Sequence, residues 1–272
     1  MAIRLIAADI DDTLLNERGE LSPRTKDAVQ EVMRRGARFV LASGRMPQAM
    51  RGTALALGVN APVIGYNGGQ IADALTGEVV RAWRVPEALA REAAALAQEL
   101  GGHVQTYQNG AYFYEEENDF SRAYAASIGL PGSAVGMPVA RWLRGEADKL
   151  LVIGEREQTR LRAERLQAHF GDRLRCAISR PNYIEIFHAQ ADKAEALAAL
   201  AEEYGLRREE IAAFGDGEND LGMLHFAGHG YVMANARVEI LRRAPAVAPS
   251  NAQDGLARLL ERWLREGRIA PV

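Results

Sequence analysis

Four aspartates stand directly after two short apolar runs of the chain. Asp9 and Asp11 follow one run, and Asp216 and Asp220 follow the other. An aspartate carboxylate can attack phosphorus and form an aspartyl phosphate, and a second carboxylate can protonate the leaving oxygen and then activate water. Because side chains alternate along an extended strand end, Asp9 and Asp11 can face one pocket. This pair is suited to phosphoryl transfer.

Carboxylates this close together need a compensating positive charge. They repel one another, and the loss of hydration on burial adds to that repulsion. Oxygen ligands without a cluster of His or Cys favour a hard ion, and Mg²⁺ accepts carboxylates together with a phosphate oxygen. Ser43 and Gly44, just before a predicted helix, and the ammonium of Lys193 can hold phosphate oxygens. We therefore expect Mg²⁺ as the cofactor of a phosphoryl-transfer site.

Lysine is rare in this chain and occurs only at Lys26, Lys149 and Lys193, whereas the other basic residues are arginines. A position that keeps lysine indicates a need for a compact ammonium on a flexible stem rather than a planar guanidinium. This usage favours a functional role for Lys193.

Alternating strand and helix patterns place these residues at the carboxyl ends of strands. We expect buried strands at residues 4–8, 37–43, 61–71, 211–215 and 230–233, and the turn residues Asn67-Gly68-Gly69 interrupt the third of them. We expect helices at residues 23–35, 47–57, 191–204, 220–226 and 254–265, with Ser22 as the N-cap of the first and Pro23 as its first residue. Such alternation predicts a parallel sheet with helices on its faces, in which functional residues lie at the carboxyl ends of the strands.

The middle of the chain has a different pattern. An Ala-rich helix is expected at residues 86–100 and a charged helix at 157–170, among strand-like runs that are separated by turns. The predicted fold class is therefore α/β, with a doubly wound, Rossmann-like parallel-sheet core domain and an inserted α+β domain. The core domain would comprise residues 1–84 and 189–272, and the insert residues 85–188.

The composition excludes several classes of protein. The chain has 272 residues, of which 48% are hydrophobic and 25% charged, and its net charge of -3 leaves no basic face for nucleic acid or an anionic membrane. Its one cysteine, Cys176, cannot form an internal disulfide, which favours a cytoplasmic protein. We expect no targeting segment. No window approaches the roughly 18 apolar residues of a membrane helix, which argues against an ion pump that uses an aspartyl phosphate.

Several motifs resemble those of one enzyme superfamily. The run Asp9-Ile10-Asp11-Asp12-Thr13-Leu14-Leu15 resembles motif one of the haloacid dehalogenase-like hydrolases, Ser43 resembles motif two and Lys193 motif three. The segment Gly215-Asp216-Gly217-Glu218-Asn219-Asp220 of this chain resembles motif four of the same family. The large insert between motifs two and three is typical of the Cof-type phosphatases. The resemblance also includes three further segments, Asn67-Gly68-Gly69, Met233-Ala234-Asn235-Ala236 and Asn251-Ala252-Gln253-Asp254-Gly255.

The resemblance implies a role for each matching residue. Asp9 would be the nucleophile and a Mg²⁺ ligand, and Asp11 the general acid and base, with its backbone carbonyl also on the metal. Asp216 would be the third protein ligand, while Asp220 would support the metal through water or hold Lys193. The phosphoryl group would be held by Ser43, Gly44, Lys193, Asn219 and the amide of Ile10. The insert would be the cap that closes over the site and selects the substrate.

Two positions depart from the family pattern, and one role stays open. Asp12 and Ala194 stand where the family usually has glycine. Asp12 adds a negative charge beside an acidic site, and we do not place it on the metal. Arg45 could reach the substrate or pair with an acidic side chain, and the sequence favours neither.

The predicted function is a Mg²⁺-dependent phosphatase for a small phosphorylated metabolite, with a sugar phosphate first and a phosphorylated cofactor or its precursor next. Two alternatives remain at this stage. A phosphomutase would use the same nucleophile, and a non-catalytic, metabolite-sensing protein could keep the fold. The presence of both Asp9 and Asp11 argues against the second alternative. We expect a monomer or a small homo-oligomer, with no nucleic-acid or membrane partner.

Overall fold

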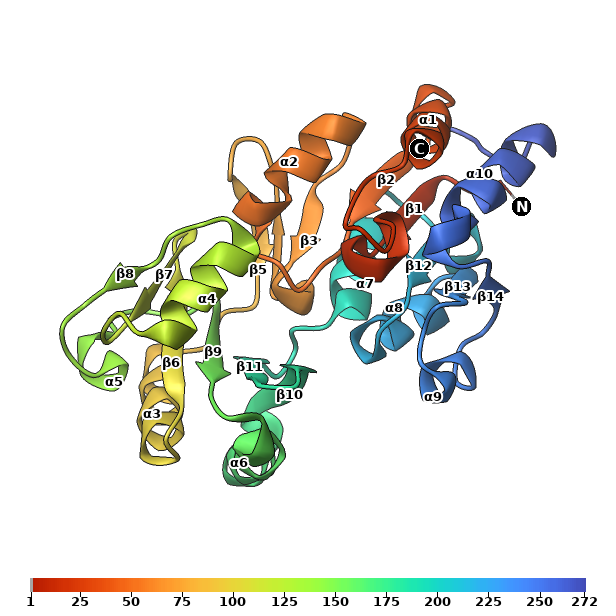
Figure 1. Ribbon diagram of the computed structural model, residues 1–272. Helices are drawn as coiled ribbons and strands as arrows, with labels where there is room; N and C mark the ends of the chain where they lie inside the picture. Colours follow the sequence, from red (N-terminus) through yellow and green to blue (C-terminus); the bar gives the residue numbers. More distant parts are fainter. Residues whose placement is uncertain (1) are drawn as a thin grey trace. The chain divides into compact units, whose positions relative to one another are not determined.

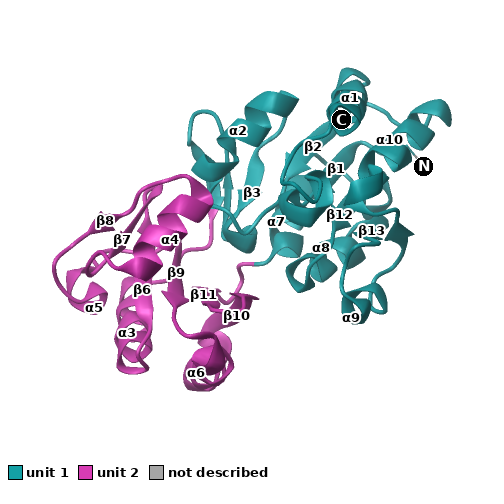
Figure 2. Cartoon of the chain, in the orientation of Figure 1, with its two compact units in different colours: residues 1–81, 192–272 teal, residues 82–191 magenta. Residues whose placement is uncertain are grey.

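The structure is a computed structural model that describes residues 2–272. The chain forms two compact units (Figure 2). The first unit contains the residues up to Arg81 together with Asp192–Val272, and the second contains Ala82–Ala191. The second unit is three residues longer at each end than the predicted insert, residues 85–188.

A parallel sheet of five strands, in the order β14-β13-β12-β1-β2, forms the centre of the first unit (Figure 1). Its strands are β1 (Leu5–Ala8), β2 (Arg38–Leu41), β12 (Ile211–Gly215), β13 (His229–Met233) and β14 (Val247–Ala248). Leu5 of β1 pairs with Ile211 on one side and with Arg38 on the other. Every residue of β1 is buried, as expected for a parallel strand with both faces covered.

The predicted strand at residues 61–71, with its interrupting turn residues, is two separate strands in the structure. A sheet of three strands, in the order β3-β4-β5, is made by β3 (Val63–Gly65), β4 (Gln70–Ala72) and β5 (Val79–Ala82). A tight turn at Tyr66–Gly68 separates β3 from β4 and lets them pair antiparallel. Tyr66, Asn67 and Gly68 have φ values of 52°, 55° and 96°, which no strand can contain.

The helices of the first unit cover the buried strands. They are α1 (Pro23–Arg34), α2 (Pro47–Leu57), α7 (Lys193–Glu203), α8 (Leu221–Phe226), α9 (Val238–Leu241) and α10 (Gly255–Arg265). Ser22 caps α1 as predicted, because its side chain accepts a hydrogen bond from the Thr25 amide. The fully buried Trp263 of α10 belongs to the core cluster that also contains Phe39 and Phe214 of the sheet.

The second unit has an antiparallel-rich sheet of six strands, in the order β10-β11-β9-β6-β7-β8. These are β6 (His103–Gln108), β7 (Ala111–Tyr114), β8 (Ser133–Ala134), β9 (Lys149–Ile153), β10 (Leu174–Arg180) and β11 (Tyr183–His188). Its helices are α3 (Glu87–Glu99), α4 (Asp119–Ile128), α5 (Val139–Trp142) and α6 (Arg156–Phe170). Ala94, Val104 and Ile184 lie in its core.

Helix α4 was not predicted from the sequence. Its limits are local, because Asn118 and Ser121 form a capping box at its start and Gly129 adopts the left-handed conformation at its end. Phe120, Tyr124 and Ile128 lie at the spacing of one helical face, so the apolar periodicity that indicates a helix is present in this segment. Within residues 2–272, no helix is both long and apolar enough to cross a membrane.

The close approach of β13 to α8 generates a test of the packing. A Cβ added at Gly230 would lie 1.9 Å from the carbonyl oxygen of Leu224, so Gly230→Ala must displace backbone. We expect it to lower the free energy of unfolding by about 2 kcal/mol or more. The matched control is Gly52→Ala in α2, where nothing lies within 4 Å and where alanine should stabilise the helix by about 1 kcal/mol. Urea denaturation measures both variants. A free energy of unfolding that Gly230→Ala leaves unchanged would contradict this packing.

Candidate active site

Three parallel strands deliver the predicted site residues to one edge of the central sheet. Asp9 follows β1, Ser43 comes shortly after β2, and Asp216 follows β12. The amide of Asp9 still donates to the carbonyl of Phe214, at 3.0 Å, so the ladder between β1 and β12 continues up to the site. Since the carboxyl ends of parallel strands meet at one edge, these side chains converge as the sequence predicts.

Lys193 lies at the centre of the cluster. Its ammonium is fully buried and donates to Asp9 Oδ1 at 2.6 Å and to Asp220 Oδ1 at 2.7 Å. Helix α7 begins at Lys193, and the Asp192 side chain caps it by accepting from the amide of Ala194. Gly68 packs so closely against this helix start that an added Cβ would lie 2.1 Å from the carbonyl carbon of Asp192.

Asp220 also fixes the loop that carries Asp216. Its Oδ2 accepts hydrogen bonds from the amides of Asp216 and Gly217, at 3.0 and 2.9 Å. A Cβ at Gly215 would lie 2.4 Å from the Asp220 side chain, so the turn has room only for glycine there. Asp216 Oδ1 accepts in turn from the Thr13 hydroxyl, at 3.1 Å. Asp220 thus orients both the ammonium of Lys193 and the carboxylate of Asp216.

The cluster carries more negative than positive charge. Oxygens of Asp9, Asp216 and Asp220 lie within 4.8 Å of one another, and the ammonium of Lys193 is the cation that contacts Asp9 and Asp220. Burial raises the pKa of Asp9 well above its usual value, and the charges of Asp220 and Asp216 add to the rise although Lys193 opposes it. Burial and the charge of Asp220 raise the pKa of Asp216 to about 6.

The charge state of Lys193 is set by the same neighbours. Burial lowers the pKa of the ammonium, but the charges of Asp220 and Asp9 outweigh this effect and raise its pKa above the usual value. Lys193 therefore stays protonated, and three carboxylates still face one ammonium. Crowded carboxylate oxygens of this kind fit a hard divalent cation, which would offset the remaining negative charge.

The carboxylate of Asp11 is not part of this cluster. It forms a bidentate pair with Arg45, whose Nε and terminal amino nitrogen lie 2.9 and 2.5 Å from its two oxygens. About half of the Asp11 side chain is exposed, in contrast to the buried Asp9. Of the two roles left open for Arg45, the structure shows the pairing with an acidic side chain.

Three of the five predicted phosphate-holding residues meet around Asn67, to which sequence reasoning gave no role. Asn67 accepts a hydrogen bond from Asn219 Nδ2, at 2.9 Å, and its amide donates to the carbonyl of Ser43, at 3.0 Å. A Cβ added at Gly44 would lie 3.1 Å from the Asn67 side chain. Asn67 therefore connects Ser43 and Gly44 to Asn219. The signal was its place in an Asn-Gly-Gly turn that follows a buried strand.

Comparisons with known proteins identify the family of this chain. A family model described as haloacid dehalogenase-like hydrolase matches residues 6–260. A solved structure of a haloacid dehalogenase-like hydrolase from Bacteroides thetaiotaomicron is 28% identical, with a TM-score of 0.86, over 96% of this chain and 99% of that one.

Two curated relatives are also similar over nearly their whole length. The 5-amino-6-(5-phospho-D-ribitylamino)uracil phosphatase YcsE of Bacillus subtilis is 27% identical, over 96% of this chain and 96% of the relative. The pyridoxal phosphate phosphatase YbhA of Escherichia coli is 27% identical, over 96% of this chain and 98% of the relative.

The raised pKa of Asp216 predicts that Asp216→Asn stabilises the metal-free protein. The folded protein holds this proton more tightly than the unfolded chain, so the free energy of unfolding falls as the pH rises from 3.8 to about 6. A shift of this size corresponds to at most about 3 kcal/mol, and partial exposure reduces it to about 1 to 2 kcal/mol. Asparagine keeps the acceptor for Thr13 and removes the charge.

Urea denaturation at neutral pH with a chelator present measures this gain. Adding Mg²⁺ to the same samples provides the control, because the wild type should gain stability from the cation and Asp216→Asn should gain much less. A variant that is less stable than the wild type in the chelator would contradict the electrostatic account of the cluster.

Proposed function

This chain belongs to the haloacid dehalogenase-like hydrolase family and is a phosphatase, and we propose that it uses Mg²⁺ to hydrolyse a small phosphate ester through an aspartyl phosphate on Asp9. The resemblance inferred from the sequence motifs, the predicted fold class and the predicted enzyme class are therefore confirmed. The observation that carries the proposal is the buried ammonium of Lys193 between Asp9 and Asp220, with Asp216 beside them.

Asp9 is the residue to which we assign the nucleophilic attack. Lys193 holds its Oδ1, so we assign Oδ2 as the oxygen that attacks phosphorus. As this bond forms, the bond from phosphorus to the ester oxygen breaks and its electron pair leaves with that oxygen. Water then attacks the same phosphorus, the bond to Oδ2 breaks, and inorganic phosphate leaves.

Asp11 is the residue that would move the protons in both halves of the reaction. It gives its proton to the ester oxygen in the first half and takes a proton from the attacking water in the second, so the two transfers balance. The bidentate contact with Arg45 occupies both oxygens of the carboxylate. A protonated Asp11 can accept through one oxygen only, and we infer that part of this contact opens during the cycle.

The remaining residues would hold the phosphoryl group and the metal. We assign the phosphoryl oxygens to Lys193, Ser43, Gly44, Asn219 and the amide of Ile10. Asp9, Asp216 and the backbone carbonyl of Asp11 would ligate Mg²⁺, with Asp220 in support. When bound, Mg²⁺ supplies positive charge that offsets the charge on the phosphoryl oxygens in the transition state.

The substrate class is supported by the relatives. One of them is named for a phosphorylated ribitylaminouracil and another for pyridoxal phosphate, and both are small phosphate esters. We propose a sugar phosphate first and a phosphorylated cofactor or its precursor next, with the second unit, Ala82–Ala191, as the part that selects between them. The proposal includes a cytoplasmic monomer or small homo-oligomer.

Replacement of the nucleophile tests the proposal directly. Asp9→Asn keeps the shape and an oxygen acceptor for Lys193 but cannot form the aspartyl phosphate, so phosphate release should fall by about a thousandfold or more. The measurement is Mg²⁺-dependent release of phosphate from p-nitrophenyl phosphate and from a panel of sugar phosphates and phosphorylated cofactors.

Asp12→Asn is the matched control for this variant. The Asp12 side chain is exposed and lies in the same loop, and asparagine tolerates its φ of 57°, so activity should stay within about threefold of the wild type. Release that survives Asp9→Asn, or that is insensitive to a chelator, would overturn the proposed mechanism. Conversion of a sugar phosphate to its isomer without release of inorganic phosphate would show that Asp9 serves a phosphomutase reaction instead.

A further inference from the structure

Two segments near the end of the chain contact the loop that carries Asp11, and no role has been assigned to them. They are the turn after β13 that contains Asn235 and the turn before α10 that contains Asn251. Asn235 Nδ2 donates to the backbone carbonyl of Asp12, at 2.8 Å. Asn251 Nδ2 donates to the backbone carbonyl of Leu15, at 3.0 Å.

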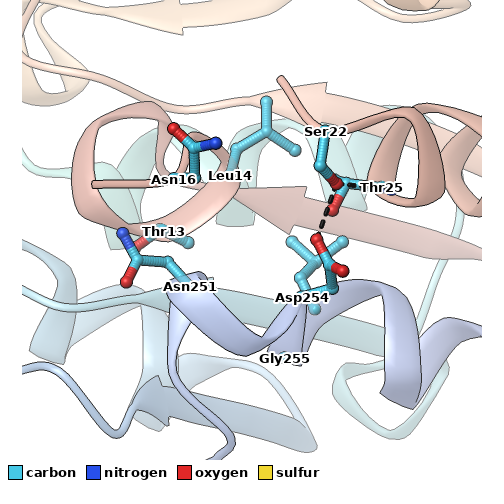
Figure 3. A pocket seen from close by; sticks show the side chains of 9 residues that line it. Thr13, Leu14, Asn16, Ser22, Thr25, Asn251, Asp254 and Gly255 are labelled. Carbon is cyan, nitrogen blue, oxygen red and sulfur yellow. Dashed lines mark hydrogen bonds between the residues drawn. The ribbon is translucent and has the colours of Figure 1, made fainter. Parts of the chain in front are cut away.

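The two asparagines are linked to each other. Asn235 Oδ1 accepts from the amide of Asn251, at 3.0 Å, and Asn251 Oδ1 accepts from the amide of Ala252, at 2.9 Å. In each side chain the amide oxygen thus accepts a hydrogen bond from the C-terminal segments, and the amide nitrogen donates one to the loop. The Asn251 side chain is buried, and it lies beside Thr13 in the small pocket drawn in Figure 3.

A third contact holds the far end of the same loop. The Asp254 carboxylate accepts from the Ser22 hydroxyl at 2.6 Å, which Figure 3 shows as a dashed line. The turn that presents Asp254 has little freedom, because Asp254 has a φ of 52° and a Cβ at Gly255 would lie 1.8 Å from the carbonyl oxygen of Pro249. The loop after β1 is therefore held by three hydrogen bonds. Two come from the turn before α10, and one comes from the turn after β13.

The loop needs such restraint because its backbone is unfavourable. Asp12 has a φ of 57°, a conformation that residues other than glycine adopt rarely. One backbone hydrogen bond, from the amide of Leu15 to the carbonyl of Ile10, closes the turn from within. Asn235 donates to the carbonyl of Asp12, the residue that directly follows Asp11, and so holds the backbone next to the residue that would act as acid and base.

We propose that Asn235 and Asn251 are positioning residues that aim the carboxyl group of Asp11 at the ester oxygen. This inference rests on the proposed function, in which Asp11 donates the proton to the leaving group. An alkyl phosphate needs that proton because an alkoxide is a poor leaving group, whereas p-nitrophenolate leaves readily without it. Loss of the two donors should therefore affect the two kinds of ester unequally.

The variants Asn235→Asp and Asn251→Asp remove one donor each. Aspartate has the same size, keeps the oxygen that accepts from the C-terminal segment, and replaces the amide nitrogen by an oxygen that repels the loop carbonyl. We expect kcat/KM for glycerol phosphate to fall by about tenfold or more and kcat/KM for p-nitrophenyl phosphate by at most about threefold. The ratio of the two values is the readout, because it cancels the concentration of folded enzyme.

Asn60→Asp is the matched control. Asn60 has the same pattern, with its Oδ1 accepting from the amide of Phe39 at 3.0 Å and its Nδ2 donating to the carbonyl of Ala37 at 2.9 Å. These contacts lie at the start of β2, whereas Ser43 of the site follows the end of that strand. Asn60→Asp should lower the melting temperature and leave the ratio within about twofold of the wild type.

Each outcome decides between the explanations. An unchanged ratio in Asn235→Asp, or an equal change in Asn60→Asp, would overturn the inference and leave the two asparagines a structural role only. Asn235 is exposed, so its variant remains decisive if the buried Asn251→Asp fails to fold. Failure of the proposed function is recognised separately, because the wild type would then release no phosphate from either ester or Asp9→Asn would retain the release.

Discussion

A single buried ammonium holds the site together. Lys193 is fully enclosed, and a buried cation without partners would be strongly unfavourable, so its two carboxylates must lie where they are. One of them, Asp9, directly follows β1, and the other, Asp220, ends the turn between β12 and α8. Their contact with one lysine fixes the relative height of two strands from opposite ends of the chain.

That constraint extends to the surrounding glycines. Gly68 allows the turn after β3 to contact the start of α7, and Gly215 allows Asp220 to fold back over its own loop. A methyl group at Gly68 would displace the backbone at Asp192 and Lys193, and one at Gly215 would displace the side chain of Asp220. The two glycines thus let the turn after β3 and the loop after β12 pack closely around Lys193 and Asp220. Stability and chemistry conflict here, since the acidic residues that suit a cation raise one another's pKa values in its absence.

Much of this arrangement could be predicted from the sequence, because strand ends are local features. An apolar run followed by acidic residues predicts both the strand and its functional edge, and the parallel order then follows from the alternation with helices. The scarcity of lysine was a useful signal as well. Two of the three lysines, Lys149 and Lys193, are buried against carboxylates, and Lys149 pairs with Glu185 in the second unit at 2.9 Å.

The remaining features could not be predicted because they depend on contacts between distant segments. The pairing of Asp11 with Arg45 requires knowledge of the side-chain direction, and Asn67 lies at the site only because three positive φ values reverse the chain after β3. The hydrogen bond from Asn235 to the carbonyl of Asp12 joins residues 223 positions apart. Helix α4 is a different case, because Phe120, Tyr124 and Ile128 follow the helical spacing and the sequence did carry a signal for this helix.

The order of the strands also has a consequence for synthesis on the ribosome. Strand β1 lies between β2 and β12 in the sheet, yet β12 is synthesised only after the whole of Ala82–Ala191. One edge of β1 therefore stays unpaired during most of translation, and the second unit has all of its own strands before the first does. Pairing over such a long sequence separation slows folding and exposes apolar strands in the meantime. The nascent chain is thus most prone to aggregation while its central strand waits for its late partner.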